Sequence, residues 1–256
     1  MKKIYKIINS KKKKPLICLT AYSKPFAKIL DKYCDIVLVG DSLATAMYGM
    51  KNTRHIEINT MIRHGISVKS NLNNAVCVVD MPANSYKNIK QAKKNAKLIF
   101  DKTKCDAVKV ECNGKNYQII KSIVDIGIPV MGHIGFTPQY FKKFKVQGLF
   151  KKDQDRLLDQ AKKNQEAGVF SIVLECVNSI TARSITKSLK IPTIGIGSSV
   201  HCDGQILVTD DMLGLSGFYP KFVRKFAKLK NIIEIGVKKY RSAVLSKKFP
   251  AKKNTF

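Results

Sequence analysis

The chain has 256 residues, of which 45% are hydrophobic, so it is long enough to fold around a large apolar core and is not expected to be disordered. Its 47 Lys and Arg residues against 18 Asp and Glu residues give a formal net charge of +29. No stretch approaches the roughly 18 consecutive apolar residues of a transmembrane helix, so we expect no membrane partner.

The positive charge allows two interpretations. Lysines occur in nearly every polar segment, without interleaved aromatic residues or a recognised nucleic-acid-binding motif. This distribution is typical of a solvated lysine-rich surface, and we therefore expect no nucleic-acid partner. A basic protein that binds a polyanion is the alternative, because the net charge alone favours one.

The cysteines and the N-terminus indicate a cellular compartment. The seven cysteines form no C-x-x-C pair, and several lie in apolar runs, as is typical of buried thiols in a reducing environment. The N-terminus starts with basic residues but lacks the apolar segment of a signal peptide. We therefore expect a soluble cytoplasmic protein.

Eight short apolar runs, rich in β-branched residues, recur along the chain, and longer lysine-rich segments with helical spacing lie between them. Such near-continuous hydrophobicity is typical of parallel strands that are covered on both faces. The predicted strands cover residues 15–22, 35–42, 75–82, 107–111, 129–135, 170–177, 191–197 and 204–211.

Helices are predicted where apolar residues share one face of a polar segment, at residues 24–34, 88–102 and 153–168. Gly168 closes the last of these segments and suits a helix C-terminus. The segment from Tyr219 onward is expected to be helical and basic, and to pack outside the strands.

The alternation of eight strands with helices predicts an α/β fold, a (β/α)₈ TIM barrel with an N-terminal extension and C-terminal helices. A doubly wound open sheet is less consistent with the strand number, and the sequence lacks a G-x-G-x-x-G motif. No linker or low-complexity stretch divides the chain. We therefore expect residues 1–256 to form a single barrel domain.

Polar residues stand at the ends of five consecutive predicted strands, where such a barrel has its catalytic face. Residues two apart on a strand share a face, so Lys109 and Glu111 can both point into the barrel mouth. The residues predicted to converge there are Asp41, Ser42, Asp80, Lys109, Glu111, His133 and Glu175.

Each of these residues also has a structural explanation when it is taken singly. Asp41 could cap the following helix, Lys109 and Glu111 could form an internal ion pair, and His133 could be a hydrogen-bonded core residue. Ionisable groups at the same end of five successive strands are harder to explain in this way, because unpaired buried charges are costly. The set therefore predicts an active site.

Carboxylates that converge without cysteine ligands or a histidine cluster favour a hard cation such as Mg²⁺. A cation beside a lysine suits an anionic, chelating substrate such as a 2-oxo acid. The cation would polarise the keto group, and a remaining carboxylate would take the proton next to it. The residues by themselves predict metal-assisted enolate chemistry.

The same stretches resemble the ketopantoate hydroxymethyltransferase family, in order, from about residue 15 to the end. The combination of GHIGFTPQ with GSSVHCDGQ is the most specific part of the resemblance. The main matching motifs are VLVGDSLA (37–44), VVDMP (78–82), AVKVE (107–111), PVMGHIGFTPQ (129–139), IVLECV (172–177) and IPTIGIGSSVHCDGQILV (191–208).

The resemblance implies a (β/α)₈ enzyme of pantothenate biosynthesis. Such an enzyme transfers a hydroxymethyl group from 5,10-methylenetetrahydrofolate to 2-oxoisovalerate (3-methyl-2-oxobutanoate), which gives 2-dehydropantoate. Members of the family are typically cytoplasmic and form large homo-oligomers, commonly decamers. The resemblance therefore also implies a homo-oligomer here.

Roles for individual residues follow from the matching motifs. The resemblance places Glu175 at the proton acceptor that forms a Mg²⁺-stabilised enolate. Asp41, Asp80 and Glu111 fall on the Mg²⁺ site. The positions that contact the oxo acid are Asp41, Ser42, Asp80 and Lys109, with His133 close to the substrate.

The chain departs from the family's motifs at Ser23 in TAYS, in the loop at residues 48–61, and at two positions where the family has glycine. It has Asn84 in PANSY, where the family has PFGSY or a similar sequence, and Ser199 in GIGSSV, where the family has a close variant of GIGAGP. These departures are expected to affect loop closure and folate affinity, Ser199 most of all, because glycine permits backbone angles that serine resists. A related Mg²⁺-dependent lyase or phosphomutase is the alternative enzyme, but its KKCGH-type cysteine motif is missing.

Overall fold

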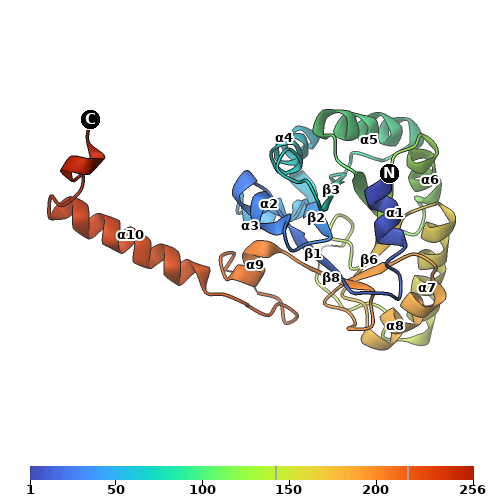
Figure 1. Cartoon of the computed structure of the whole chain (residues 1–256). Helices are drawn as coiled ribbons and strands as arrows, with labels where there is room; N and C mark the ends of the chain where they lie inside the picture. The colour runs from blue at the N-terminus through green and yellow to red at the C-terminus, as the bar shows by residue number, and fades with distance from the viewer. Residues whose placement is uncertain (142, 218) are drawn as a thin grey trace. The chain divides into compact units, whose positions relative to one another are not determined.

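The computed structural model describes residues 1–141, 143–217 and 219–256. In the described chain, parallel strands close into a barrel in which each strand pairs with the next and β8 pairs with β1 (Figure 1). The predicted (β/α)₈ fold is confirmed. The strands are β1 (Leu16–Thr20), β2 (Ile36–Val39), β3 (Val76–Asp80), β4 (Ala107–Glu111), β5 (Val130–Gly135), β6 (Ser171–Glu175), β7 (Thr193–Ile196) and β8 (Gly204–Leu207).

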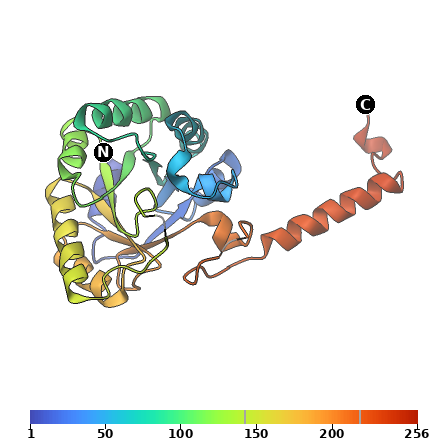
Figure 2. The same ribbon diagram turned by 180° about the vertical axis from the view of Figure 1, so that it is seen from behind.

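All eight predicted strands are present in the barrel, and most are shorter than the predicted runs because those runs include loop residues. The helices α4 to α8 cover the outside of the barrel (Figures 1 and 2). The helical elements of the barrel unit are α1 (Lys2–Ile8), α2 (Lys24–Leu30), α3 (Leu43–Ala46), η1 (Thr53–His55), α4 (Ile58–Lys69), α5 (Ile89–Thr103), α6 (Tyr117–Asp125), α7 (Lys151–Glu166) and α8 (Ser179–Ser188).

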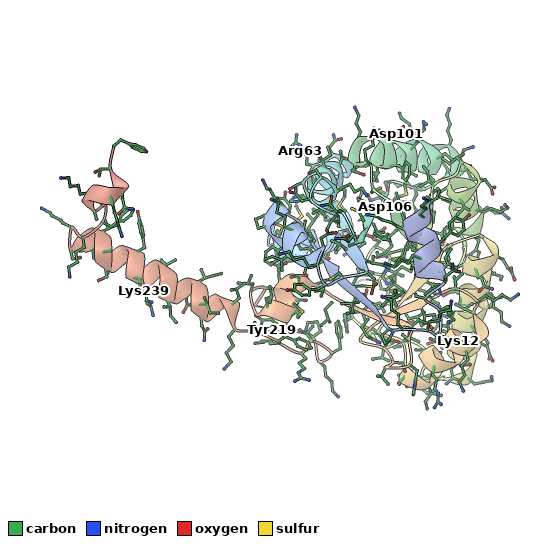
Figure 3. The ribbon with its side chains drawn as sticks, viewed as in Figure 1. Lys12, Arg63, Asp101, Asp106, Tyr219 and Lys239 are labelled. Carbon is green, nitrogen blue, oxygen red and sulfur yellow. The ribbon has the colours of Figure 1, made fainter. Side chains whose placement is uncertain are left out.

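The helices predicted at residues 24–34, 88–102 and 153–168 correspond to α2, α5 and α7. Gly168 lies just beyond the end of α7 with φ +90°, which is the left-handed conformation that commonly ends a helix. Figure 3 shows the polar side chains of the outer helices at the surface, among them Arg63 of α4 and Asp101 of α5.

The chain divides into two compact units, and the first, Met1–Val208, contains the barrel. The second unit, Thr209–Phe256, contains α9 (Thr209–Leu213), α10 (Leu229–Leu245) and η2 (Lys252–Asn254). The helical character predicted from Tyr219 onward is confirmed by α10. Its packing outside the barrel and the single domain over residues 1–256 stay predictions.

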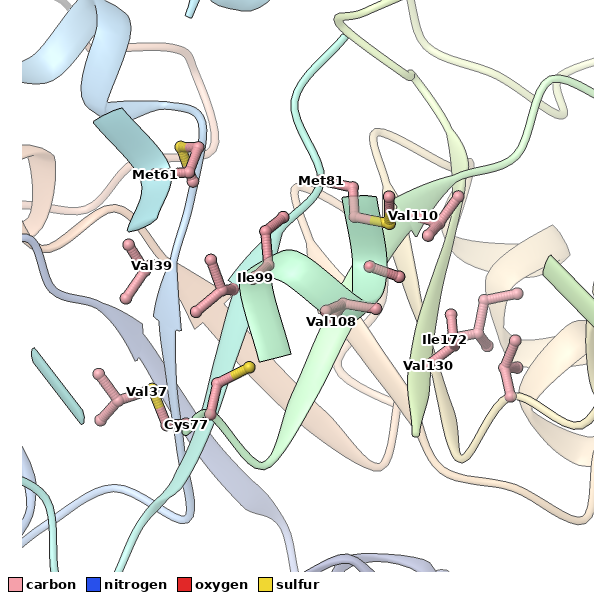
Figure 4. Close-up of a cluster of buried hydrophobic side chains, with 14 of the residues drawn as sticks. Val37, Val39, Met61, Cys77, Met81, Ile99, Val108, Val110, Val130 and Ile172 are labelled. Carbon is pink, nitrogen blue, oxygen red and sulfur yellow. The ribbon is translucent and has the colours of Figure 1, made fainter. Parts of the chain in front are cut away.

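Two apolar layers form because side chains alternate along each strand. One layer lies between the strands and the outer helices, where Val37 and Val39 of β2 join Met61 of α4 and Ile99 of α5 (Figure 4). Complete burial of one such aliphatic side chain contributes about 1.5–3 kcal/mol. This layer fixes the helices against the barrel and so holds the strand ends in place.

The second layer fills the barrel interior with side chains that include Ile36, Met131 and Val173. Ile4 and Ile7 of α1 belong to the same cluster, so the N-terminal helix covers the N-terminal end of the barrel. The interior is therefore filled at that end, and any site must lie toward the C-terminal ends of the strands.

The cysteines agree with the sequence analysis, since all seven are buried and none forms a disulfide within the described residues. No helix in the described ranges combines the length and the apolar character needed to cross a membrane.

Candidate active site

The side chains that face the barrel interior change from apolar to ionisable along β3 and β4. On β3 they pass from Val78 to Asp80, and on β4 they pass from Ala107 to Lys109 and Glu111. The apolar residues lie toward the strand N-termini, and the ionisable residues lie toward the C-termini. Lys109 and Glu111, the charged residues of AVKVE, therefore lie where the apolar interior of the barrel ends and the polar site begins.

The parallel register places the ionisable residues beside one another. Asp80 pairs with Lys109 between β3 and β4, and Glu111 pairs with His133 between β4 and β5. Glu175 ends β6, the next strand around the barrel. Residues from four successive strands thus meet at one end of the barrel, where the sequence analysis placed them.

Lys109 and Asp80 form a buried ion pair. The Nζ atom of Lys109 lies 2.8 Å from Oδ1 of Asp80, and their side chains are only 6% and 2% exposed. Burial alone would lower the pKa of Lys109, but the carboxylates of Asp80, Asp41 and Glu111 outweigh it and hold that pKa above its usual range. Lys109 is therefore a fixed cation in the site.

Asp41 lies directly beside this pair. Its main-chain N–H donates to Oδ2 of Asp80 at 2.9 Å, and its Oδ2 accepts from Nε2 of Gln139 at 2.8 Å. Burial, followed by the charge of Asp80, raises the pKa of Asp41 to about 7, while Lys109 and Gln139 oppose the rise. The interpretation of Asp41 as a helix cap is wrong, because Ser42 precedes α3 and the Asp41 carboxylate bonds to Gln139 instead.

Glu111 is a further buried carboxylate in this cluster. Its Oε2 accepts from the main-chain N–H of Gln139 at 3.0 Å. Burial raises the pKa of Glu111 well above its ordinary value, and the neighbouring charges of Asp41 and Glu175 raise it further. Like-charged carboxylates that raise one another's pKa form a centre that favours a cation.

His133 lies between two carboxylates. Its Nδ1 is 3.6 Å from Oε1 of Glu111, and its Nε2 is 3.2 Å from Oε2 of Glu175. Burial, followed by the charge of Lys109, lowers the pKa of His133 well below its ordinary value, so the imidazole is neutral. Among the described residues, no partner gives either ring nitrogen a hydrogen bond of good geometry, and the main chain of Phe136 only opposes the fall in pKa.

Glu175 ends its strand beside His133. Burial raises the pKa of its carboxyl group to about 8; the charge of Asp80 adds to this rise, and Lys109 opposes it. A carboxylate with a pKa near neutrality is a stronger base than an ordinary one and still exists partly in its ionised form. The site thus combines a fixed cation with a carboxylate suited to proton transfer.

Ser42 lies at the edge of the site. Its Oγ is 2.8 Å from the hydroxyl oxygen of Tyr22, which fixes the orientation of the serine side chain. A Cβ on Gly40 would lie 2.8 Å from this Oγ and 3.6 Å from Oδ2 of Asp80. Glycine at this position therefore allows the segment after β2 to approach the site closely.

Gly135 has a similar role beside Glu175. It has φ +97°, and a Cβ built on it would lie 2.2 Å from the main-chain oxygen of Glu175. That oxygen accepts a hydrogen bond from the main-chain N–H of Phe136 at 2.8 Å. Any side chain at position 135 would displace the end of β6, and with it Glu175.

The two positions at which the family has glycine, Asn84 and Ser199, differ in backbone conformation. Asn84 has φ +66°, and asparagine is one of the few residues that adopt this conformation readily, so it can replace glycine there. Ser199 is not among the described non-glycine residues with positive φ, and its buried Oγ accepts from Oγ of Ser179 at 3.0 Å. The backbone around Ser199 therefore does not require glycine.

Two functional candidates were missed by the sequence analysis. Gln139 contacts Asp41 and Glu111, and the hydroxyl of Tyr86 donates to Oε1 of Gln139. Neither residue carries a charge or ends a strand, so neither met the criterion used for the other candidates. The available signal was the position of Gln139 at the end of the PVMGHIGFTPQ motif, just beyond β5.

The carboxylates can be considered as ligands for a metal ion. No group of three or more His, Cys, Asp or Glu side chains in the described ranges already stands in the arrangement of a metal site. The donor set nevertheless fits Mg²⁺, because Asp41, Asp80 and Glu111 supply hard oxygen donors and water can complete the shell. A cation there would also relieve the repulsion that raises the pKa of Asp41 and Glu111.

Comparisons with known proteins identify relatives over the whole chain. The family model described as ketopantoate hydroxymethyltransferase matches residues 2–252. A 3-methyl-2-oxobutanoate hydroxymethyltransferase from Pelagibacter ubique (strain HTCC1062) is 47% identical over 255 residues, which cover 100% of this chain and 99% of the relative. The enzyme of the same name from Chelativorans sp. (strain BNC1) is 45% identical over 255 residues, which cover 98% and 90% of the two chains.

Solved structures share the fold at low sequence identity. Phosphoenolpyruvate phosphomutase from Streptomyces platensis subsp. rosaceus has a TM-score of 0.65 and 9% identity, and the match covers 96% of this chain and 87% of that one. Phosphonopyruvate hydrolase, in a complex with oxalate and Mg²⁺, has a TM-score of 0.59 and 12% identity, with 99% and 93% covered. These similarities support the barrel architecture.

Proposed function

Since the chain belongs to the ketopantoate hydroxymethyltransferase family, and is therefore a hydroxymethyltransferase of pantothenate synthesis, we propose that its one-carbon donor is 5,10-methylenetetrahydrofolate. The acceptor is 3-methyl-2-oxobutanoate (2-oxoisovalerate), and the product is 2-dehydropantoate. The resemblance drawn from the motifs is confirmed by the family match. The lyase or phosphomutase alternative is not retained, because the likeness to those enzymes is one of fold alone.

The substrate is an anion, and Lys109 is the cation that receives it. The raised pKa of Lys109 keeps the ammonium group charged across the physiological pH range. We assign to it the anionic oxygens of the 2-oxo acid, with Ser42 and the neutral His133 as further polar contacts. The buried surroundings strengthen each of these contacts, since few water molecules compete for them.

Asp41, Asp80 and Glu111 would hold Mg²⁺, directly or through water. When it is bound, the cation supplies Lewis-acid polarisation of the substrate's keto oxygen. Glu111 is itself fixed by the main-chain N–H of Gln139, and Asp80 by the main-chain N–H of Asp41. Main-chain hydrogen bonds thus support the orientation of Glu111 and Asp80, and the side chain of Gln139 bonds to Asp41.

Glu175 is the base that removes the proton from C3 of 2-oxoisovalerate. The electrons of the broken C–H bond form a C2–C3 double bond, and negative charge develops on the keto oxygen. C3 then forms a carbon–carbon bond to the methylene carbon of the folate as the bond from that carbon to one folate nitrogen breaks, and this nitrogen takes a proton. Water then replaces the second folate nitrogen, which takes a proton from the water, so that a hydroxymethyl group and tetrahydrofolate remain. The pKa of Glu175, raised to about 8, matches the demands of proton abstraction near neutral pH.

The observation that carries this proposal is the convergence of Lys109, Glu111, His133 and Glu175 at one end of the barrel, in a chain of this family. The test supplies the enzyme with 2-oxoisovalerate, Mg²⁺ and 5,10-methylenetetrahydrofolate labelled with ¹³C in the methylene group. Mass spectrometry should find 2-dehydropantoate that carries the label. Unlabelled product would reject the folate as donor, and the absence of product would reject the activity.

We also propose that the protein works in the cytoplasm as a homo-oligomer, as large as a decamer. The observation in favour is α10, which has no buried residue and exposes Ile232, Ile235 and Val237. Exposed apolar surface of this kind suits association between chains. Light scattering after size-exclusion chromatography should give a mass several times the 28.7 kDa of one chain. A monomeric mass at micromolar concentration would contradict the proposal.

A further inference from the structure

Gln139 contacts two of the proposed metal ligands at once. Its Nε2 donates to Oδ2 of Asp41 at 2.8 Å, and its main-chain N–H donates to Oε2 of Glu111 at 3.0 Å. Gln139 is 8% exposed, so water has little access to these bonds. One residue therefore links two carboxylates of the same charge, one just after β2 and the other at the end of β4.

The side-chain amide of Gln139 is held in one orientation. Nε2 also donates to the main-chain oxygen of Met81 at 3.1 Å, and Oε1 accepts from the hydroxyl of Tyr86. Rotation of the amide by 180° would place Oε1 against the main-chain oxygen of Met81 and the ionised carboxylate of Asp41, neither of which can donate a hydrogen bond. The arrangement of partners thus selects the orientation in which the N–H group points at Asp41.

The turn around Gln139 directs the main-chain N–H group of Gln139 at Glu111. The main-chain N–H groups of Tyr140 and Phe141 both donate to the oxygen of Thr137, at 2.9 Å each. This turn closes around Gln139 and leaves its own N–H group directed at the carboxylate. The contact to Glu111 comes from the main chain, so a substitution at position 139 leaves this donor in place.

We propose that Gln139 is a positioning residue for the divalent cation: it holds Asp41 in the orientation that binds the ion, and Tyr86 sets the orientation of its amide. This inference rests on the proposed function, because it requires Asp41 and Glu111 to be ligands. Hydrogen bonds that orient metal ligands commonly contribute 10–100-fold to metal affinity, roughly the effect expected here.

The test measures Mn²⁺ affinity by electron paramagnetic resonance and Mg²⁺ affinity by competition against it, so it does not depend on turnover. Gln139→Leu removes the amide and keeps the main-chain donor to Glu111. Its dissociation constant for Mn²⁺ should rise about 10–100-fold. Tyr86→Phe removes only the hydroxyl that orients the amide, and should raise the constant in the same direction by a smaller factor.

Gln160→Leu is the matched control. Gln160 of α7 is also 8% exposed, and its side chain bonds to Arg156 outside the site. This variant should bind Mn²⁺ like the wild-type protein, so a loss of affinity shared by both glutamine variants would indicate a general loss of packing and overturn the inference.

The remaining outcomes separate the inference from the function on which it rests. Wild-type affinity in both Gln139→Leu and Tyr86→Phe would overturn the positioning role and leave the metal site intact. Failure of the wild-type protein to bind Mn²⁺ at a saturable site would overturn both. If Gln139→Leu does not fold, the conservative Tyr86→Phe variant decides, and unchanged affinity in it rejects the role of Tyr86 and with it the proposal.

Discussion

The ammonium nitrogen of Lys109 lies 2.8 Å from Oδ1 of Asp80, between adjacent strands of a closed barrel, and both side chains are buried. Burying such a pair costs desolvation energy that its attraction repays only in part, so stability alone does not account for it. The pair is consistent with a site that binds an anion. The carboxylates of Asp41 and Glu111 also lie near Lys109 and, with Asp80, keep it in its cationic form.

Lys109→Met should destabilise the fold by about 3–5 kcal/mol, because it leaves Asp80 without its partner in the interior. It should also abolish the binding of 2-oxoisovalerate. Urea denaturation and calorimetric titration measure the two effects. Lys121→Met is the control, since Lys121 forms an ion pair with Asp125 at the same 2.8 Å distance on an exposed face, where such pairs contribute about 0–1 kcal/mol. Equal losses in the two variants would contradict the account.

Stability without metal should fall as the pH rises from about 4 to about 8. Burial raises the pKa of Asp41 from 3.8 to about 7 and that of Glu175 from 4.5 to about 8. The folded protein therefore binds these protons more tightly than the unfolded chain. This contribution is complete below the ordinary pKa values, falls as the pH rises from the ordinary to the raised values, and is lost above them. Each group contributes roughly 1.4 kcal/mol per pH unit within its window.

Thermal denaturation in EDTA across this pH range measures the effect. Mg²⁺ should reduce the slope, because a bound cation favours the ionised carboxylates. Glu175→Gln should have a shallower slope than the wild-type protein and a higher melting temperature at pH 8.5. A melting temperature that rises with pH in EDTA would contradict the placement of these carboxyl groups in a buried cluster.

Gly135→Ala should impair proton abstraction more than other glycine substitutions. The new Cβ would lie 2.2 Å from the main-chain oxygen of Glu175, so the end of β6 must move. Gly127→Ala is the control, because Gly127 has a similar positive φ of +83° and its new methyl group would have no atom within 4 Å. Both should lose about 1–3 kcal/mol from backbone strain, and only Gly135→Ala should also slow C3 proton exchange. Similar exchange rates in the two variants would contradict the role of Gly135.

The strands were predictable from sequence because both faces of each strand are buried, which makes the runs almost continuously apolar. The charged part of the site followed from the position of Asp80, Lys109 and Glu175 at strand ends. The role of Gln139 was not predictable in this way, since an uncharged residue in a loop gives no such signal and its partners are set by three-dimensional register. The packing of Ile4 and Ile7 beneath the barrel was also missed, because seven residues of helix are too few to show a clear period.

The most direct test of the account is whether Glu175 removes the C3 proton of 2-oxoisovalerate. NMR in D₂O follows the exchange of this proton with wild-type protein and with Glu175→Gln, in Mg²⁺ and in EDTA. Exchange should require the divalent cation and should be about 100-fold slower or more in Glu175→Gln, while that variant still binds Mg²⁺. Exchange at the wild-type rate in Glu175→Gln, or no exchange with folded wild-type protein in Mg²⁺, would contradict it.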